Sequence, residues 1–138
     1  RDVQVGSSFS LHEKASSVSV NSIGTDQIGL DIGPESITLF KKYLRSAKTV
    51  IWNGPLGYYE NKAFAHATKE IAKCIQSLTA TSIVGGGETA DALRTLNLTH
   101  DITYISTGGG ATLQFLEGKA LPGMRALEES YRQFRNQA

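Results

Sequence analysis

The sequence predicts an α/β fold: part of a Rossmann-like parallel sheet with helices on both faces. From residue 34 onward, short apolar strands alternate regularly with amphipathic helices. Two glycine triplets, at 85–87 and 108–110, each stand between a strand and the next helix. Such alternation favours right-handed crossovers and a parallel sheet. Because a parallel sheet needs cover on both faces and three central strands make a thin one, we expect a fragment of a larger three-layer domain.

Hydrophobic periodicity and chain breakers place the individual elements. Apolar side chains at helical spacing predict helices over residues 34–47, 61–78, 89–96, 111–117 and 123–135. Runs rich in β-branched and aromatic residues predict strands over residues 49–52, 80–84 and 102–105. Residues 2–5 and 18–21 are compatible with two more short strands, and residues 11–15 with a loop or turn. On the last helix, Tyr131 and Phe134 form either a docking stripe or part of a core, and a core is the commoner outcome.

Length, charge and cysteine content exclude several classes of protein. The 138 residues suit one ordinary domain, and 14 Lys/Arg against 13 Asp/Glu give a net charge of +1. This balance argues against a dedicated nucleic-acid binder, and no apolar run is long enough to cross a membrane. Cys74 is the only cysteine, which is typical of a reducing cytoplasmic setting. The three histidines are scattered, so neither a metal centre nor a catalytic triad is expected.

The first glycine triplet has the pattern of an anion site. Glycine after a strand lets the backbone approach a ligand closely, and the following helix offers unpaired N–H groups and its positive dipole end. Thr89 adds a hydroxyl for a phosphate oxygen, and Glu88 fits beside an anion if a nucleotide carries Mg²⁺ between them. The alternative is a tight turn in which Glu88 only complements the helix dipole.

The second triplet repeats this device one strand–helix unit later, and two neighbouring anion sites could hold two ends of a polyphosphate. Neither triplet is followed by Lys-Ser/Thr, and neither has the spacing of a dinucleotide fingerprint. The segment from Trp52 to Pro55 also follows a strand. It is either a rigid turn or a wall of the same cleft, with Asn53 donating to phosphate and Glu60 reaching a ribose hydroxyl.

Five blocks of sequence, in order, resemble phosphoglycerate kinases. They are GLDIGPES at 29–36, VIWNGPLG at 50–57 with Glu60, IVGGGET at 83–89, STGGGA at 106–111, and LEGK with LPG at 116–123. The resemblance covers residues 26–127 and places the chain at the closing part of the C-terminal, nucleotide-binding domain. It implies a partial nucleotide-binding domain over residues 1–122. Residues 123–138 would form a helical tail that docks on an N-terminal domain outside this chain.

The resemblance also implies an activity. Phosphoglycerate kinases are cytoplasmic glycolytic enzymes that transfer a phosphoryl group between 1,3-bisphosphoglycerate and Mg-ADP, giving 3-phosphoglycerate and ATP. The arginines that bind 3-phosphoglycerate and the lysines that clamp the nucleotide belong to parts of the family outside this chain. We therefore expect the isolated chain to be inactive. The resemblance also implies that the full-length enzyme is a monomer. The alternative is a non-catalytic nucleotide- or anion-binding α/β module.

Individual roles carry over from the family onto matching positions. The resemblance implies that Gly29 and Leu30 border the adenine, that Tyr58 packs on the nucleoside and that Glu60 binds the ribose. The implied nucleotide-binding residues are Gly29, Leu30, Asn53, Pro55, Gly57, Tyr58, Glu60, Gly86, Gly87, Glu88 and Thr89. The implied catalytic residues are Gly87, Gly108, Gly109 and Gly110, the last three at the transferring group. Glu88 is the implied magnesium contact, and it replaces the aspartate that the family usually has there.

Overall fold

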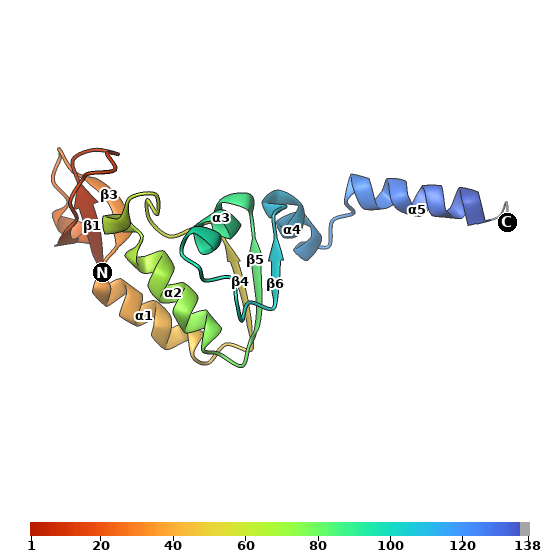
Figure 1. The fold of residues 1–138 in the computed structure, drawn as a ribbon, viewed down its shortest axis with the longest axis horizontal. Helices are drawn as coiled ribbons and strands as arrows, with labels where there is room; N and C mark the ends of the chain where they lie inside the picture. The colour runs from red at the N-terminus through yellow and green to blue at the C-terminus, as the bar shows by residue number, and fades with distance from the viewer. Residues whose placement is uncertain (136–138) are drawn as a thin grey trace.

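The computed structural model describes residues 1–135, within which the strands form two three-stranded sheets (Figure 1). β4 (Thr49–Asn53), β5 (Thr81–Gly85) and β6 (Tyr104–Ser106) are parallel and lie in the order β4-β5-β6. β1 (Asp2–Gly6), β2 (Ser16–Ser19) and β3 (Ile28–Ile32) form an antiparallel sheet in the order β2-β1-β3. The parallel sheet confirms the predicted α/β class.

The helices follow the predicted order with shifted ends. They are α1 (Pro34–Leu44), α2 (His66–Gln76), α3 (Gly87–Thr95), α4 (Gly109–Leu116) and α5 (Pro122–Arg135), with short 3₁₀ turns η1 (Val20–Ser22) and η2 (Lys62–Phe64). α2 begins five residues later than predicted because Asn61 caps η2 instead, accepting a hydrogen bond of 2.9 Å from the Ala63 N–H. α3 and α4 begin inside the glycine triplets, so Gly87, Gly109 and Gly110 belong to first helical turns, whereas Gly85 ends β5.

The antiparallel sheet was only partly anticipated. The candidate strand at 2–5 is confirmed as β1, whereas the candidate at 18–21 pairs at 16–19 and then turns into η1. β3 was not predicted, because a five-residue run that contains Gly29 and is followed by Gly33 gives little alternation. Val5 and Leu30 of this sheet are buried, so it has a small core of its own.

The main core lies between α1, α2, α3 and the parallel sheet. Its buried members are Ile37, Val50, Trp52, Ala67, Ile71, Ala72, Ile75, Val84, Leu93 and Leu98. Cys74 is also buried. Full burial of a Leu or Ile side chain stabilises a fold by about 1.5–3 kcal/mol, so this cluster fixes the orientation of β4 and β5.

α5 has a different environment. Figure 1 shows it projecting away from the rest of the molecule, beyond α4. Tyr131 and Phe134 are exposed, so the expectation that they belong to a core is wrong. Met124 and Leu127 lie at the same helical spacing and are exposed too, which leaves one apolar face of α5 uncovered among the described residues. Within residues 1–135, no helix is both long and apolar enough to cross a bilayer.

Candidate functional site

The carboxyl ends of the three parallel strands lie side by side. Asn53 of β4 is paired with Gly85 of β5, and Gly85 is paired with Ser106 of β6. Because the strands are parallel, the segments that follow these residues all leave from one edge of the sheet. Ligands of open α/β sheets bind at this edge.

The two glycine triplets touch each other at this edge. The Gly86 N–H donates a 2.9 Å hydrogen bond to the Ser106 carbonyl oxygen, which ties the first triplet to the end of β6. A Cβ atom on Gly109 would lie only 3.0 Å from the Gly86 Cα and 3.2 Å from the Asn53 Oδ1. Gly86 has a φ of +100°, and a Cβ there would lie 2.8 Å from the same amide oxygen. Neither Gly86 nor Gly109 therefore tolerates a side chain without movement.

The helix starts at these triplets have no side-chain caps. Gly86 precedes α3 and Gly108 precedes α4, and neither can accept a hydrogen bond with a side chain. Gly87, Gly108 and Gly110 are exposed. Free N–H groups and the positive ends of two helix dipoles thus converge on one spot, an arrangement that favours a bound anion.

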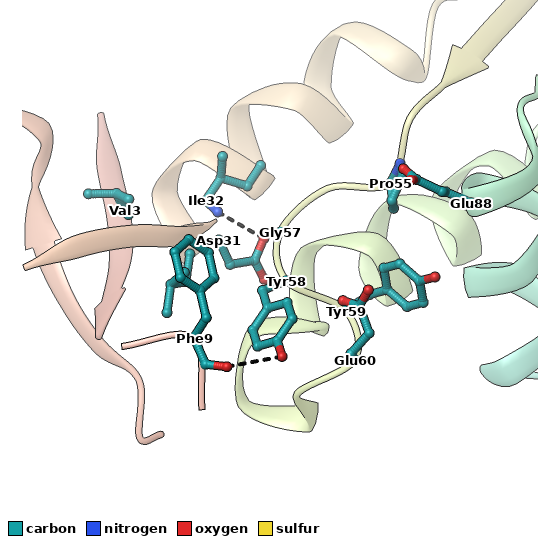
Figure 2. Close-up of a pocket in the computed structure, with 12 residues that line it drawn as sticks. Val3, Phe9, Asp31, Ile32, Pro55, Gly57, Tyr58, Tyr59, Glu60 and Glu88 are labelled. Carbon is teal, nitrogen blue, oxygen red and sulfur yellow. Dashed lines mark hydrogen bonds between the residues drawn. The ribbon is translucent and has the colours of Figure 1, made fainter. Parts of the chain in front are cut away.

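A cleft of about 520 Å³ lies beside this edge (Figure 2). Seven of the predicted nucleotide-binding residues line it: Gly29, Leu30, Pro55, Gly57, Tyr58, Glu60 and Glu88. The other predicted residues, which are Asn53, Gly86, Gly87, Thr89, Gly108, Gly109 and Gly110, lie outside the lining. Pro55 and Glu88 join the two groups, because Pro55 follows Asn53 by two residues and Glu88 follows the first triplet.

One end of the cleft is aromatic. The Tyr58 ring meets the Phe9 ring edge-on, with centroids 5.8 Å apart and an interplanar angle of 83°. The Tyr58 hydroxyl also donates to the Phe9 carbonyl oxygen at 3.1 Å (Figure 2). Sequence reasoning missed Phe9, because it lies 49 residues upstream, in a β1–β2 connection whose contact with Tyr58 no local pattern reveals.

Asp31 is a second lining residue that sequence reasoning missed, although it stands inside the recognised block at 29–36. It is 5% exposed. Its carboxylate accepts hydrogen bonds from the Ala67 N–H at 3.0 Å and the Ile32 N–H at 2.8 Å. Burial raises the pKa of Asp31 to about 6, although both hydrogen bonds and His66 act to lower it. The signal that could have identified Asp31 is its position as an acidic residue between apolar ones in the GLDIGPES block.

Tyr59 connects the cleft to α3. Its hydroxyl donates to Asp91 Oδ2 at 3.3 Å. Burial and the neighbouring carboxylates of Glu60 and Asp91 raise the pKa of Tyr59, so it stays a neutral hydrogen-bond donor. The remaining missed lining residues, Val3 and Ile32, add apolar surface.

Glu88 is the acidic residue at the other end of the cleft. It is exposed in the first turn of α3, and Figure 2 shows it beside Pro55. No group of three His, Cys, Asp or Glu side chains capable of holding a metal ion is found within residues 1–135. Mg²⁺ in nucleotide sites commonly takes one or two carboxylates together with phosphate oxygens, so a single carboxylate at this place fits a metal that arrives with its ligand.

Thr89 has a structural contact in this conformation. Its side chain has 0% exposure, and its Oγ1 accepts a hydrogen bond of 2.8 Å from the Gly54 N–H. This contact holds the segment after β4 against α3. A hydrogen bond from the Thr89 hydroxyl to a phosphate would require the hydroxyl to be uncovered first.

The fold and the site define a parallel α/β protein with a cleft and two uncapped, glycine-led helix starts at the carboxyl edge of its sheet. The family model described as phosphoglycerate kinase matches residues 1–119. The chain belongs to the phosphoglycerate kinase family. This confirms the resemblance carried by the five sequence blocks.

Individual relatives agree with the family match. The phosphoglycerate kinase of Pelotomaculum thermopropionicum is 48% identical over 126 residues, which cover 91% of this chain and 32% of that protein. The phosphoglycerate kinase of Onion yellows phytoplasma is 45% identical over 131 residues, which cover 94% of this chain and 33% of that protein. The chain therefore spans about a third of the length of the curated relatives it matches.

Solved structures give the same result. Phosphoglycerate kinase from Coxiella burnetii matches with a TM-score of 0.82 and 40% identity, covering 90% of this chain and 32% of that one. Phosphoglycerate kinase from Pyrococcus horikoshii matches with a TM-score of 0.81 and 32% identity, covering 95% and 32%. The fold described above is thus the fold of a part of these enzymes.

Proposed function

We propose that this chain is the nucleotide-binding part of a phosphoglycerate kinase, which transfers a phosphoryl group between 1,3-bisphosphoglycerate and Mg-ADP. The observation that carries the proposal is the convergence of two uncapped helix starts beside a cleft with an aromatic end. A nucleoside diphosphate has the matching parts, because its base and sugar suit the cleft and its phosphates suit the free N–H groups.

The nucleoside end is assigned to the cleft itself. Gly29 and Leu30 present backbone and an apolar side chain to the base, and the Tyr58 ring packs against it. Glu60 is exposed at the rim, where its carboxylate accepts hydrogen bonds from ribose hydroxyls. Pro55 and Gly57 complete the wall without adding polar groups.

The phosphate end is assigned to the edge of the parallel sheet. The Gly87 amide at the start of α3 holds the nucleotide phosphates, together with Asn53 and, once its hydroxyl is uncovered, Thr89. The Gly86 N–H is already paired with the Ser106 carbonyl oxygen, so Gly86 contributes by letting the backbone come close to the phosphates. Glu88 contacts the Mg²⁺ that the nucleotide carries, and this ion neutralises phosphate charge when it is bound. The start of α4, with Gly108, Gly109 and Gly110, faces the transferring phosphoryl group.

The reaction needs positioning more than proton transfer. A β-phosphate oxygen of ADP forms a new P–O bond as the bond between phosphorus and the carboxyl oxygen of the acyl phosphate breaks. The leaving carboxylate of 3-phosphoglycerate keeps the electron pair, so no proton has to move. The residues of this chain therefore act by orienting the nucleotide and by placing N–H groups where negative charge gathers.

The second substrate is assigned to an N-terminal domain outside residues 1–138. The exposed apolar face of α5 supports this, because Met124, Leu127, Tyr131 and Phe134 lack cover among the described residues. We assign residues 1–122 to the nucleotide-binding domain and 123–138 to a tail that docks on the other domain; residues 136–138 lie outside the described part. We place the whole enzyme in the cytoplasm as a monomer.

The isolated 138-residue chain should show no phosphoglycerate kinase turnover, because it lacks the domain assigned to the acyl phosphate. A coupled assay that compares the isolated chain with the full-length protein tests this. Turnover of the isolated chain near about 10 per second, an ordinary enzymatic rate, would contradict it. Nucleotide binding without turnover in the full-length protein would instead favour the non-catalytic binding module.

Glu88→Gln in the full-length protein should raise the Mg²⁺ concentration needed for half-maximal activity by about tenfold, because a neutral amide is a poor ligand for a hard cation. A matched control is Glu35→Gln, since Glu35 is also exposed in the first turn of a helix but lies outside the cleft. Unchanged magnesium dependence in Glu88→Gln would remove the metal assignment.

A further inference from the structure

The turn at residues 56–58 is held by contacts with α2 on one side and β3 on the other. It leaves the end of β4, contributes Gly57 and Tyr58 to the cleft, and returns toward η2. The Tyr58 N–H donates to the Leu30 carbonyl oxygen at 2.7 Å, which joins the turn to β3. Its other attachments come from two side chains that neither the sequence analysis nor the proposed function uses, Thr68 and Asp31.

Thr68 holds the first residue of the turn from the first turn of α2. Its side chain is fully buried, with 0% exposure. Its Oγ1 accepts a hydrogen bond of 2.9 Å from the Leu56 N–H and donates one to the Leu56 carbonyl oxygen. A single hydroxyl therefore satisfies both backbone groups of Leu56, much as a paired strand would.

Asp31 supports the middle of the turn from β3. Its Oδ2 accepts from the Ala67 N–H at 3.0 Å, so the carboxylate also caps α2, whose N-cap residue Ala65 has no capping side chain. Gly57 packs directly on this carboxylate, because a Cβ there would lie 2.5 Å from Asp31 Oδ1. Gly57 has a φ of +69°, which only glycine adopts easily, so the turn and the carboxylate fit each other without a side chain between them.

We propose that Asp31 and Thr68 are positioning residues, which fix the 56–58 turn against the start of α2 and thereby set the nucleoside end of the cleft. The inference rests on the proposed function, because it assumes that the cleft takes a nucleoside. The two residues act through Gly57 and Tyr58 and need no contact with the ligand. Their loss should therefore weaken nucleotide binding and leave the phosphoryl-transfer step intact.

The charge on Asp31 gives this arrangement a pH dependence. The ionised carboxylate offers an acceptor oxygen to each of the Ala67 and Ile32 N–H groups, whereas a protonated one keeps a single strong acceptor. The charged groups around it are His66 at the start of α2, and Glu60 and Glu88 in the lining of the cleft. Burial outweighs the loss of an acceptor, because it raises the pKa of Asp31 to about 6, so acidification through about pH 6 should favour the buried arrangement over an opened one.

The experiment uses five variants of the full-length protein. Asp31→Asn and Thr68→Val remove the two attachments, and Thr68→Ser keeps the hydroxyl. Asp2→Asn and Thr38→Val are matched controls, since Asp2 caps α1 and the Thr38 hydroxyl donates to the Pro34 carbonyl oxygen, both outside the cleft. The measurements are KM for Mg-ADP, KM for the phosphoglycerate substrate, kcat, and amide hydrogen exchange of residues 54–60.

For Asp31→Asn and Thr68→Val we expect KM for Mg-ADP to rise about tenfold, because Asp31→Asn removes the charged acceptor at the start of α2 and Thr68→Val removes both hydrogen bonds to Leu56. The KM for the other substrate and kcat should stay within about twofold, and exchange at residues 56–58 should become about tenfold faster. Thr68→Ser should behave as the wild type.

Two results would overturn the inference. One is a change in KM or exchange that the controls Asp2→Asn and Thr38→Val share, since that reports general destabilisation. The other is unaltered exchange at residues 56–58 in Thr68→Val, which needs no ligand and applies even if Asp31→Asn does not fold. A wild-type protein that bound no nucleotide while Thr68→Val still lost protection would contradict the proposed function and leave the positioning roles supported.

Discussion

The first turn of an α-helix leaves backbone N–H groups without partners inside the helix. Two helices of this chain receive a carboxylate there, and two do not. α1 and α2 follow Gly33 and Ala65, which have no capping side chains, yet aspartates from the antiparallel sheet cap both helices. Asp2 accepts from the Glu35 and Ser36 N–H groups at 3.0 and 2.8 Å, and Asp31 accepts from the Ala67 N–H. α3 and α4 follow glycines and receive no such carboxylate.

The difference distinguishes helix starts whose N–H groups are bound by the protein's own carboxylates from helix starts whose N–H groups are free to bind a ligand. A carboxylate at a helix start satisfies free N–H groups and complements the dipole, which stabilises the helix by about 0.5–2 kcal/mol. At α3 and α4 this stabilisation is absent, and the free N–H groups meet at the edge of the parallel sheet. The pair without caps is the one that we propose binds phosphate, and a ligand anion there would take the place that Asp2 and Asp31 have at the starts of α1 and α2.

The largest effect should come from crowding the point where the two uncapped starts meet. Gly109→Val would place a branched side chain against the Gly86 Cα and the Asn53 amide oxygen, 3.0 and 3.2 Å from its Cβ. Because the triplets touch, we expect kcat to fall at least about 100-fold and nucleotide affinity to fall as well.

Steady-state kinetics and calorimetry with Mg-ADP measure both effects, and circular dichroism checks folding. Gly123→Val is the matched control, since Gly123 also lies in the first turn of a helix and a Cβ there meets nothing within 4 Å. A folded Gly109→Val protein with normal nucleotide affinity would show that the triplets work independently after all.

A smaller effect should follow from converting an uncapped start into a capped one. Gly108 has room for a side chain, because a Cβ there would meet only Ser106 Oγ at 3.7 Å and the Ala111 Cβ at 3.8 Å. Gly108→Asp should therefore stabilise the fold by about 0.3 kcal/mol through the new cap, since glycine is only slightly worse than aspartate at this position. It should also lower kcat/KM about tenfold or more, because its carboxylate competes with the transferring group for the same N–H groups.

Gly108→Asn distinguishes the effect of a helix cap from the effect of a negative charge at the start of α4. Asparagine caps a helix about as well as aspartate does, but it carries no charge, so it should stabilise similarly with a smaller loss of activity. Thermal unfolding and initial rates give both numbers. Equal activities for the two variants would indicate that the negative charge at this helix start has no bearing on catalysis.

Part of the fold could be predicted because it depends on local pattern. Residues 49–52 and 80–84 are β-branched runs that end at asparagine or glycine, and they form β4 and β5 with little change. The antiparallel sheet could not be predicted, because the pairing of Asp2 with Ser19 and of Val3 with Ile32 joins distant segments. The same limit applies to α5, whose amphipathic pattern predicts a buried face but does not say what covers it.

The site divides in the same way. Short motifs identified Pro55, Tyr58 and Glu88, because each lies in a recognisable block next to a strand end. Phe9 and the cap that Asp31 gives α2 depend on tertiary contacts, so no local spacing reveals them. Thr89 shows the converse case, since its motif predicts a ligand contact and the structure gives its buried hydroxyl a contact with the Gly54 N–H.

The smallest predicted effect comes from removing the Asp2 carboxylate, which caps the start of α1. Asp2→Ala should lower the free energy of unfolding by about 1 kcal/mol at neutral pH, the usual cost of losing a helix cap, with nucleotide KM unchanged. Burial acts to raise the pKa of Asp2, but hydrogen bonds from Glu35 and Ser36 outweigh it, and the pKa lies below its ordinary value of 3.8. The unfolded chain therefore binds the proton more readily than the folded one.

It follows that the stabilisation by Asp2 is complete above pH 3.8 and disappears as the pH falls through the lower pKa of the folded state. Asp31 has the opposite sign: its pKa is raised to about 6, so the folded state holds the proton more tightly and its ionisation lowers stability as the pH rises from 3.8 to about 6. Denaturant unfolding of wild type, Asp2→Ala and Asp31→Asn across this range measures both slopes, with Asp26→Ala as an exposed control. If the difference between wild type and Asp2→Ala persisted unchanged in acid, the Asp2 carboxylate would not be acting as a charged cap, and the contrast between the two pairs of helix starts would rest on α2 alone.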